Sequence, residues 1–332
     1  MKQNITIMIT EAQIEKTITE LFSNIKFTAE PAGLYDPLRY MIEIGGKRVR
    51  PRLCLLTYAL FKDELNDDIL APASALEVFH SFTLIHDDIM DNAEVRRGVP
   101  TVYKKWSPNT AILSGDVMLI EAYKLIQHAP EHALRKAIDL FSKTAAEVCE
   151  GQQFDMEFEN RENVSIEEYM KMIGLKTAVL IACASKMGAI IAGASEKECQ
   201  ALYNYGYKLG LAFQIADDWL DTYADPKVFG KAIGGDILNN KKSWLITKAF
   251  EEDTLGQMKE AMNMPIETKE QKAEKIARVK EIYARLSISE QAQEEIARLT
   301  KEAQEQVEYL GLGKIKTEYL HRYADTLLGR RK

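Results

Sequence analysis

Apolar residues recur at spacings of three and four through nearly the whole chain, and the apolar–polar alternation typical of strands is almost absent. The periodic segments, each of which predicts a helix, are residues 10–27, 36–43, 48–62, 70–91, 110–127, 131–156, 166–193, 196–224, 242–262, 266–288, 290–310 and 313–328. Glycine or proline marks several of the breaks between these segments, for example Pro31, Gly45-Gly46 and Pro130, as expected of helix ends. Because there is no Pro- or Ser-rich linker and no internal repeat, the pattern predicts one all-α domain over residues 1–332, a bundle of about ten or more antiparallel helices.

Charge and composition exclude several classes of protein. The chain of 332 residues has 43 Lys and Arg against 50 Asp and Glu, which gives a net charge of −7. A general nucleic-acid binder needs a cationic surface, so we expect no nucleic-acid partner. Hydrophobic residues make up 46% and charged residues 28%, which is typical of a folded globular protein and not of a disordered chain.

Targeting and redox signals favour the cytoplasm. The N-terminal residues lack the apolar core of a signal peptide. The longest apolar stretch, Ala178–Ala194, contains Lys186 and is too short to span a membrane, so we interpret it as a buried helix. No Cys-x-x-Cys pair occurs, which argues against a zinc site or a disulfide framework. The cysteines are scattered, as in proteins of a reducing compartment, at Cys54, Cys149, Cys183 and Cys199.

Two clusters of aspartates end two apolar helical segments. Asp87, Asp88 and Asp91 follow the apolar run that begins at Ala71. A second cluster repeats the i, i+1, i+4 spacing at Asp217, Asp218 and Asp221. Like charges at i and i+4 repel, and aspartate is unfavourable near the negative end of a helix dipole. One such cluster alone would favour a solvated acidic patch. Two clusters indicate hard oxygen ligands for Mg²⁺ that is shared with substrate phosphates.

Cations gather where a surface helix would not need them. The run Gly45–Arg52 places four cations at a predicted helix start, where the dipole favours an anion. Arg96 and Arg97 follow the first aspartate cluster, and Lys231 and Lys241 follow the second. A solvated basic loop is the alternative for the first run. His80 lies on the apolar helix, where a histidine is more often a core residue than a ligand.

Carboxylates that suit Mg²⁺, cations that suit phosphate and helices rich in Phe, Leu, Ile and Met together describe a site for a diphosphate attached to a hydrocarbon. The same residues closely resemble the trans-isoprenyl diphosphate synthases, also called the polyprenyl synthetase family. The motifs that carry the resemblance occur in family order over nearly the whole chain: GGKRVRP at Gly45–Pro51, His80, DDIMD at Asp87–Asp91, RRG at Arg96–Gly98, KT at Lys176-Thr177, QIADDWLD at Gln214–Asp221, GK at Gly230-Lys231 and GGDILNNKK at Gly234–Lys242.

The resemblance implies roles for these residues. Four hold the diphosphate of isopentenyl diphosphate: Lys47, Arg50, His80 and Arg97. Three Mg²⁺ on the allylic diphosphate are bound by Asp87, Asp88, Asp91, Asp217 and Asp221, with Asp218 in the same network. The catalytic and allylic diphosphate-binding residues are Arg96, Lys176, Thr177, Gln214, Lys231 and Lys241. Of these, Lys176, Thr177 and Gln214 line the reacting carbon.

The resemblance also implies an all-α fold around a deep apolar cavity, a homodimer, and head-to-tail condensation of isopentenyl diphosphate with allylic diphosphates. The helix over residues 178–194, rich in small residues, suits either a subunit interface or a buried position within one chain. The C-terminal Arg330–Lys332 is expected to close over isopentenyl diphosphate, with a solvated tail as the alternative.

Product length is expected to depend on residues below the first aspartates. Thr83 and Phe79 lie i−4 and i−8 from Asp87, so Phe79 sits about 12 Å down the helix and forms a floor. By resemblance, a bulky aromatic at Phe82 marks a short-chain enzyme. Since Thr83 replaces the second of two adjacent aromatics common in farnesyl synthases of this motif type, we favour the C20 product, geranylgeranyl diphosphate, over C15 farnesyl diphosphate.

Two kinds of related protein are alternative interpretations, and the sequence argues against both. A terpene cyclase would share the first aspartate cluster but would not need the basic run at Gly45–Pro51 together with Arg97. A non-catalytic regulatory subunit usually loses aspartates, whereas all six are present here.

Overall fold

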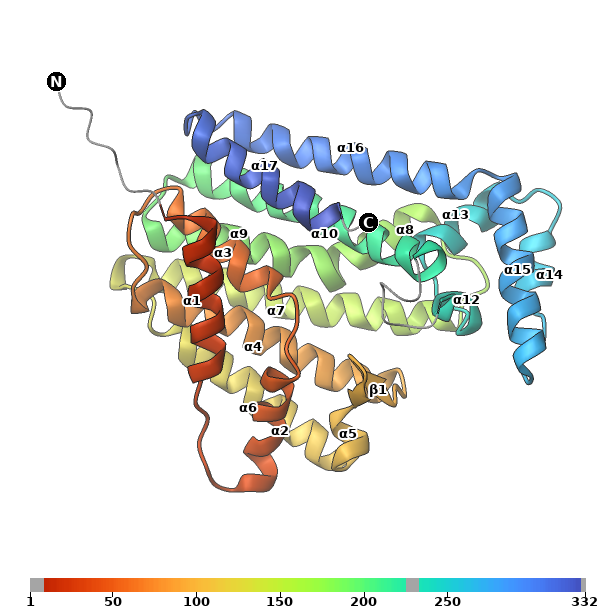
Figure 1. Cartoon of the computed structure of the whole chain (residues 1–332), viewed down its shortest axis with the longest axis horizontal. Coiled ribbons are helices and arrows are strands. Elements are labelled where there is room, and N and C mark those ends of the chain that lie inside the picture. Colours follow the sequence, from red (N-terminus) through yellow and green to blue (C-terminus); the bar gives the residue numbers. More distant parts are fainter. Residues whose placement is uncertain (1–8, 225–232, 330–332) are drawn as a thin grey trace. The chain divides into compact units, whose positions relative to one another are not determined.

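The computed structural model describes residues 9–224 and 233–329, which are almost wholly helical (Figure 1). Two compact units share the chain: Met1–Lys143 with Cys183–Tyr203, and Thr144–Ala182 with Asn204–Lys332. The helices and strands are α1 (Glu11–Asn24), α2 (Ala32–Glu43), α3 (Val49–Ala59), α4 (Asp67–Met90), β1 (Val95–Arg96), β2 (Val99–Pro100), α5 (Val102–Lys105), α6 (Pro108–Ile126), α7 (Glu131–Glu159), α8 (Ile166–Ile173), the π-helix η1 (Gly174–Ala178), α9 (Val179–Ala192), α10 (Glu196–Tyr223), α12 (Gly235–Leu238), α13 (Trp244–Glu252), α14 (Gln257–Met262), α15 (Lys269–Arg285), α16 (Ile288–Glu308) and α17 (Lys314–Leu328). The expectation of an all-α fold is confirmed.

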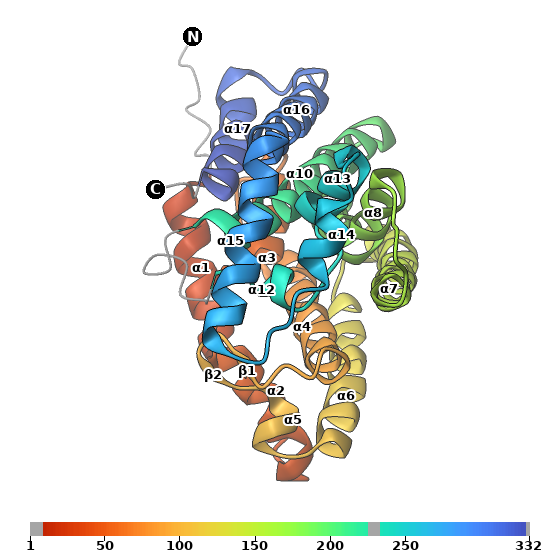
Figure 2. The same ribbon diagram turned by 90° about the vertical axis from the view of Figure 1, so that its right-hand side faces the viewer.

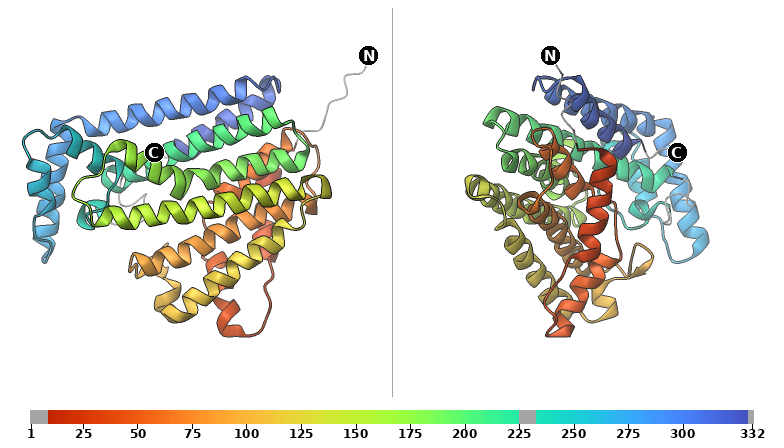
Figure 3. Two further views of the ribbon diagram at one scale, coloured as in Figure 1. Left: turned by 180° about the vertical axis from the view of Figure 1, so that it is seen from behind. Right: turned by 60° about the vertical axis from the view of Figure 1, so that its left-hand side comes forward.

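In the first unit, α4 is the central helix. It lies side by side with α6 along its length, and α3 packs on it from another side (Figures 1 and 3). Thirteen of the 24 residues of α4 are buried, so its apolar surface extends around most of the helix. This burial fixes the C-terminal end of α4, where the first aspartate cluster lies.

In the second unit, α16 and α17 form an antiparallel pair, and α15 runs across the end of α16 (Figure 1). Figure 2 shows α12 and α14 alongside α15. The core of this unit is formed by apolar residues of α8, α10, α13, α15 and α16, among them Tyr169, Ile215, Ile246 and Ile282. It buries the C-terminal half of α10, which carries the second aspartate cluster.

Local sequence signals explain where many helices begin and end. Capping boxes start α1, α8 and α15, with Thr10, Ser165 and Thr268 as the N-cap residues. At the end of α9, Gly193 takes φ +79°, and the Ala194 N–H donates to the Ala189 carbonyl, as in a Schellman motif.

The helix predictions were wrong in detail at several places: the short helices α5 and α12 were not predicted, and two further differences have a clear physical cause. Residues 242–262 form two helices and not one, because the Asp253 carboxylate accepts the Met258 N–H at 2.7 Å and caps α14, while Gly256 turns the chain at φ +72°. The hairpin of β1 and β2 was not predicted as strands, because two-residue strands carry no periodicity.

Two apolar helical stretches are long enough to cross a membrane by length and composition: Asp67–Met90 and Ile166–Ala192. In each, most of the apolar window is buried within the protein, which is typical of a core helix. The residues of α9 are nearly all buried within the chain, so of the two interpretations of this helix the intrachain one is favoured.

Candidate active site

The first aspartate cluster is tied to Arg96. Asp88 is buried, and its two carboxylate oxygens accept Nε–H of Arg96 at 2.9 and 3.0 Å. Nη2 of the same guanidinium lies 2.8 Å from Asp88 Oδ1 and 3.7 Å from Asp87 Oδ2. Burial raises the pKa of Asp88 above its ordinary value, and the Arg96 hydrogen bonds oppose that rise. Arg96 therefore contacts the aspartates that were predicted to bind metal.

A tight turn places Arg96. Strands β1 and β2 pair Arg96 with Val99, so the loop between them is Arg97-Gly98. Both loop residues have positive φ, 53° and 80°, as a two-residue hairpin of this type requires. Glycine suits the second position, and the hairpin returns Arg96 toward the end of α4.

The four cations at the start of α3 separate into two kinds. Arg48 forms a buried ion pair with Glu77 at 2.8 Å and also donates to the Ile42 carbonyl at 2.6 Å. Arg52 pairs with Glu15 at 2.7 Å. Arg48 and Arg52 are thus engaged within the protein. Lys47 and Arg50 are the two members of the run that were predicted to bind phosphate, and that role stays a prediction.

His80, Arg50 and Arg97 form one electropositive group. Burial lowers the pKa of His80 well below its ordinary value, and the positive charges of Arg50 and Arg97 lower it further. Burial likewise lowers the pKa of Arg97. The structure therefore brings together three of the four residues predicted to hold isopentenyl diphosphate. Lys47 is exposed in the loop just before α3.

The three carboxylates of the second aspartate cluster differ in how deeply they are buried. Asp218 is buried and accepts three hydrogen bonds, from the Tyr169 hydroxyl at 2.5 Å, the Trp244 backbone N–H at 2.7 Å and the Gln214 amide at 3.0 Å. Burial raises the pKa of Asp218 to about 6. Asp217 and Asp221 are half-buried. Asp218 is thus held within the unit by these three hydrogen bonds, and Asp217 and Asp221 are the members of the cluster that reach the surface of the unit.

Lys176 and Thr177 lie in η1, a π-helical turn within the helix that was predicted for residues 166–193. Such bulges are frequent at functional sites. Lys176 Nζ lies 2.7 Å from Asp155 Oδ2, and the Thr177 hydroxyl donates to the Gln214 Oε1 at 2.9 Å. Because Gln214 in turn donates to Asp218, the chain Thr177–Gln214–Asp218 links the KT motif to the second aspartate cluster.

Residues 234–236 are anchored on Asp221. The Asp221 carboxylate accepts the Asp236 N–H at 3.0 Å, and its backbone carbonyl accepts the Gly234 N–H at 2.7 Å. Lys241 Nζ lies 2.8 Å from Glu159 Oε1 at the end of α7. The predicted residues Lys231 and Arg330–Lys332 lie outside the described residues.

The chain-length residues take part in an aromatic cluster on α4. The Phe79 ring centroid is 5.4 Å from that of Phe82 and 5.2 Å from that of Phe141. Phe82 also packs edge-on against His86, at 4.9 Å. The Thr83 hydroxyl donates to the His80 carbonyl at 2.8 Å. Phe79 and Phe82 therefore support each other, which their separate positions on a helical wheel did not indicate.

Sequence reasoning missed several partners of the predicted residues, namely Asp155, Glu159, Tyr169, Asp236 and Trp244. Asp236 lies inside the GGDILNNKK motif and Asp155 lies on an amphipathic helix, so their acidity was visible in the sequence. Tyr169 and the backbone of Trp244 carry no sequence signal, because only the fold brings them to Asp218.

The aspartates fit Mg²⁺ by chemistry. Carboxylate oxygens are the ligands that Mg²⁺ prefers, and the ion usually keeps waters and takes further ligands from substrate phosphates. Among the described residues, no three acidic, histidine or cysteine side chains are grouped closely enough to hold an ion by themselves. An ion held by one or two carboxylates and a diphosphate is consistent with this arrangement.

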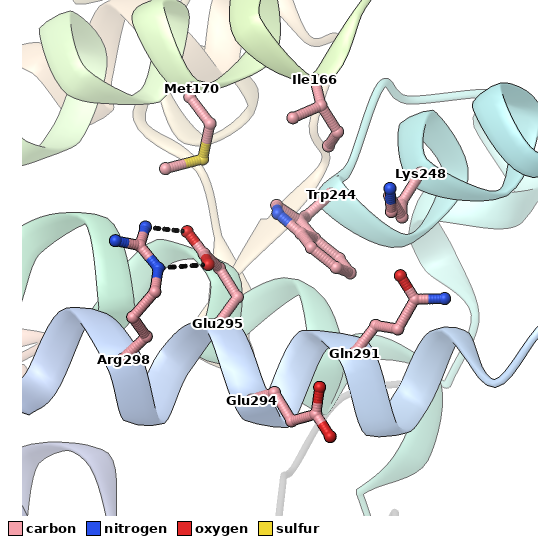
Figure 4. Close-up of a pocket in the computed structure, with 8 residues that line it drawn as sticks. All are labelled: Ile166, Met170, Trp244, Lys248, Gln291, Glu294, Glu295 and Arg298. Carbon is pink, nitrogen blue, oxygen red and sulfur yellow. Dashed lines mark hydrogen bonds and ion pairs between the residues drawn. The ribbon is translucent and has the colours of Figure 1, made fainter.

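A pocket of about 370 Å³ contains none of the residues predicted for the site, although Trp244, whose N–H binds Asp218, lines it (Figure 4). Its walls come from α8, α13 and α16, and it is lined by Ile166, Met170, Trp244, Lys248, Gln291, Glu294, Glu295 and Arg298. Figure 4 shows the Arg298 guanidinium bound to both carboxylate oxygens of Glu295, at 2.6 and 2.8 Å. Lys248 pairs with Glu252 at 3.0 Å. Its cations are thus matched by carboxylates, and no predicted substrate residue lines it.

Comparison with known proteins identifies the class. The polyprenyl synthetase family model matches residues 31–286, and the chain belongs to this family. It is therefore a prenyltransferase with the all-α isoprenoid synthase fold. The family generally uses Mg²⁺ and acts on isoprenoid diphosphates.

Its relatives include geranylgeranyl and geranylfarnesyl diphosphate synthases. The chain is 40% identical over 242 residues to the geranylgeranyl diphosphate synthase of Methanosarcina mazei, which covers 72% of this chain and 73% of that one. It is also 40% identical over 249 residues to the geranylfarnesyl diphosphate synthase of Natronomonas pharaonis, with 70% and 73% covered. A crystal structure of a geranylgeranyl pyrophosphate synthase is 44% identical, with a TM-score of 0.91 over 97% of this chain and 99% of that one.

Proposed function

We propose that this protein catalyses the Mg²⁺-dependent head-to-tail condensation of isopentenyl diphosphate with allylic diphosphates, with geranylgeranyl diphosphate as the main product. The observation that carries the proposal is the presence of two separate sets of charged groups. One is the cationic group of Arg50, Arg97 and His80. The other is the aspartate cluster at the end of α4, where Arg96 binds Asp88. One diphosphate suits each set, as a two-substrate condensation requires.

Isopentenyl diphosphate is assigned to the cationic group, with Lys47 as a fourth contact. Arginine forks bind phosphate oxygens in pairs, and partial burial strengthens each contact. His80 is neutral at working pH, because its pKa is lowered well below its ordinary value. It therefore serves as a hydrogen-bonding partner and not as a third fixed charge.

The allylic diphosphate is assigned to Mg²⁺ held by the aspartates. Asp87, Asp91, Asp217 and Asp221 are the proposed ligands, and three ions are expected with substrate bound. Asp88 and Asp218 orient their neighbours, since Arg96 holds the one and Tyr169, Trp244 and Gln214 hold the other. Bound Mg²⁺ supplies stabilisation of the charge that develops on departing pyrophosphate.

The residues of the chain then shape the reaction. Lys241 and Arg96, with Lys231, bind the allylic diphosphate, so that its carbon–oxygen bond breaks with the electron pair leaving on pyrophosphate. Dipoles of Thr177, Gln214 and the η1 backbone face the resulting allylic cation. The isopentenyl double bond attacks that cation to form the new carbon–carbon bond. The proton lost from the adjacent carbon goes to pyrophosphate, so no enzyme nucleophile is needed.

The C20 assignment takes Phe79 and Phe82, whose rings pack together, as the floor for the growing chain, with the smaller Thr83 beside them. The geranylgeranyl synthases among the relatives support this length. Because the relative from Natronomonas pharaonis is named a geranylfarnesyl synthase, a longer product is one alternative for this protein. The shorter alternative is C15 farnesyl diphosphate. A homodimer is proposed from the family resemblance. A cytoplasmic location is supported by four free cysteines.

Product analysis tests the proposal. The purified protein is incubated with Mg²⁺, isopentenyl diphosphate and dimethylallyl, geranyl or farnesyl diphosphate in turn, and the dephosphorylated products are sized. A C20 alcohol from all three starters is the expected result. A cyclised hydrocarbon formed without isopentenyl diphosphate would identify a terpene cyclase, and a lack of any product would identify a non-catalytic subunit.

A further inference from the structure

Residues 253–305 are the most polar part of the chain and have no part in the proposed reaction. One residue in this stretch departs from that pattern. Lys275 of α15 is only 1% exposed, although lysine is almost never fully buried without partners. Its Nζ donates to Asn240 Oδ1 at 2.8 Å and to the Met262 carbonyl at 2.8 Å. Burial lowers its pKa below the ordinary value of a lysine.

The two acceptors of the Lys275 ammonium group belong to different segments of the chain. Met262 is the last residue of α14, where a backbone carbonyl has no partner within its own helix, so this contact ties α14 to α15. Asn240 is the residue before Lys241, and it is held in the left-handed region at φ +53°. The second contact therefore reaches the segment that carries a proposed diphosphate-binding lysine.

Two further contacts from α15 meet the same part of the chain. A Cβ atom on Gly234 would lie 2.8 Å from the Cδ1 of Ile276, so the turn at Gly234 packs closely on α15. Lys280 Nζ donates to the Thr222 carbonyl at 3.3 Å, which places a cation at the C-terminal end of α10. Figure 2 shows α12, which begins directly after Gly234, alongside α15.

Residues 234–241, which include α12, are held by hydrogen bonds to Asp221 and to one another. Asp221 accepts the Asp236 N–H, and the Lys241 N–H donates to the Asp236 carbonyl at 3.0 Å. The first end of this segment is thus fixed on a proposed metal ligand. Its other end, at Asn240 and Lys241, is fixed by the side chain of Lys275.

From these contacts we infer that Lys275 is a positioning residue for the allylic diphosphate: through Asn240 it sets the place of Lys241. The inference rests on the proposed function, because it takes Lys241 as a diphosphate contact. It gives α15 a part in the reaction, although no residue of α15 is among the proposed substrate contacts.

The test compares Lys275→Met with Lys272→Met in the full-length protein. Methionine keeps the length of the buried stem and removes the donors, whereas Lys272 is an exposed lysine on the same helix. KM for farnesyl diphosphate and KM for isopentenyl diphosphate are measured for both. Lys275→Met is expected to raise KM for farnesyl diphosphate at least about fivefold and to leave KM for isopentenyl diphosphate within about twofold. Lys272→Met should match the wild type.

A second variant separates positioning from simple stabilisation. Asn240→Gly keeps the left-handed backbone accessible and removes the acceptor, while the contact of Lys275 with Met262 remains. It should raise KM for farnesyl diphosphate in the same way as Lys275→Met, and the double variant should be no worse than Lys275→Met alone. Backbone hydrogen exchange at Asp236 and Lys241 should increase in both single variants without substrate.

The outcomes distinguish the inference from the function on which it rests. An active wild type together with an unchanged KM for farnesyl diphosphate in Asn240→Gly would overturn the inference, whatever Lys275→Met does to the melting temperature. A wild type without condensation activity would overturn the proposed function instead. In that case faster exchange at Lys241 would still support the structural link, and unchanged exchange would refute it.

Discussion

A Cβ atom on Gly46 would lie 2.7 Å from Nη2 of Arg97, and 2.8 Å from both Cζ and Nη1. The guanidinium therefore rests against the backbone of the GGKRVRP loop at a place where a Cβ atom would displace it. Gly46 also has φ +148°, a value that other residues rarely adopt. This contact joins the basic run at the start of α3 to the hairpin that follows the first aspartates.

Gly46→Ala should displace Arg97 and weaken binding of isopentenyl diphosphate. We expect KM for this substrate to rise by about tenfold or more, because one charge-assisted contact contributes about 1.5–3 kcal/mol. KM for the allylic substrate should change by less than about twofold. Gly33→Ala is the control, since no atom lies within 4 Å of a Cβ there and Gly33 is within helix α2. Equal effects on both substrates would contradict the assignment of Arg97.

The two ion pairs of the basic run should differ in their effect on stability. Arg48→Met leaves the buried Glu77 carboxylate without its ion-pair partner, and we expect the free energy of unfolding to fall by about 3–5 kcal/mol. Arg52→Met breaks a pair with Glu15, which is half exposed, and should cost less than about 1 kcal/mol. Urea denaturation measures both. Similar losses would show that the buried pair of Arg48 with Glu77 contributes no more to stability than the partly exposed pair of Arg52 with Glu15.

Variants of the first two aspartates of the second cluster should differ in their effects on catalysis and on stability. Asp217→Ala is expected to reduce kcat by roughly a thousandfold, because it removes a proposed metal ligand, while the melting temperature stays the same or rises. Asp218→Ala removes the acceptor of three buried hydrogen bonds and should lower both activity and melting temperature. Asp87→Ala should behave as Asp217→Ala does. Retention of more than a few per cent of activity in Asp217→Ala would refute the metal assignment.

Acid sensitivity should include a contribution from His80. Its pKa is lowered in the folded protein, so the unfolded chain binds the extra proton first as pH falls. The stability that neutral His80 contributes is therefore fully present above pH of about 6.5 and is lost as pH falls toward its folded pKa, by at most about 1.4 kcal/mol per pH unit. His80→Gln should show a smaller loss between pH 7 and 5.5 in thermal unfolding. A slope equal to that of the wild type would mean that His80 is not the group responsible.

Product length should respond to the aromatic cluster of α4. Phe82→Ala should lengthen the product by at least one isoprene unit, and adding Phe79→Ala should lengthen it further, because the floor is removed. Thr83→Phe should shorten the product toward C15. Since Phe79 is fully buried, its loss should also cost about 3–5 kcal/mol of stability, and products are compared at a temperature where each variant is folded. An unchanged chain length in all three would place the floor elsewhere.

The sequence was sufficient to predict the helical fold and the ends of α4 and α10, because long apolar periodic segments ending in aspartates have few other interpretations. Family resemblance alone assigned Lys47 and Arg50 to phosphate, and that assignment stays a prediction. The ion pairs of Arg48 with Glu77 and of Arg52 with Glu15 could not be predicted, because these partners are 29 and 37 positions away.

Contacts between distant segments could not be predicted. The division of the second cluster into a buried Asp218 and half-buried Asp217 and Asp221 depends on Tyr169 and Trp244, whose positions only the fold determines. Lys275 is similar: in the sequence it is one of several charged residues on a polar helix, and its burial against Asn240 appears only when α15 packs against α12.

The most direct test of the account is transfer of label from isopentenyl diphosphate into product. Labelled isopentenyl diphosphate and unlabelled farnesyl diphosphate are supplied with Mg²⁺, and the labelled alcohol and the released pyrophosphate are measured together. The account predicts a labelled C20 alcohol, one pyrophosphate for each label incorporated, and loss of both with EDTA or in Asp217→Ala. Consumption of farnesyl diphosphate without incorporation of label, or incorporation that persists in Asp217→Ala, would contradict it.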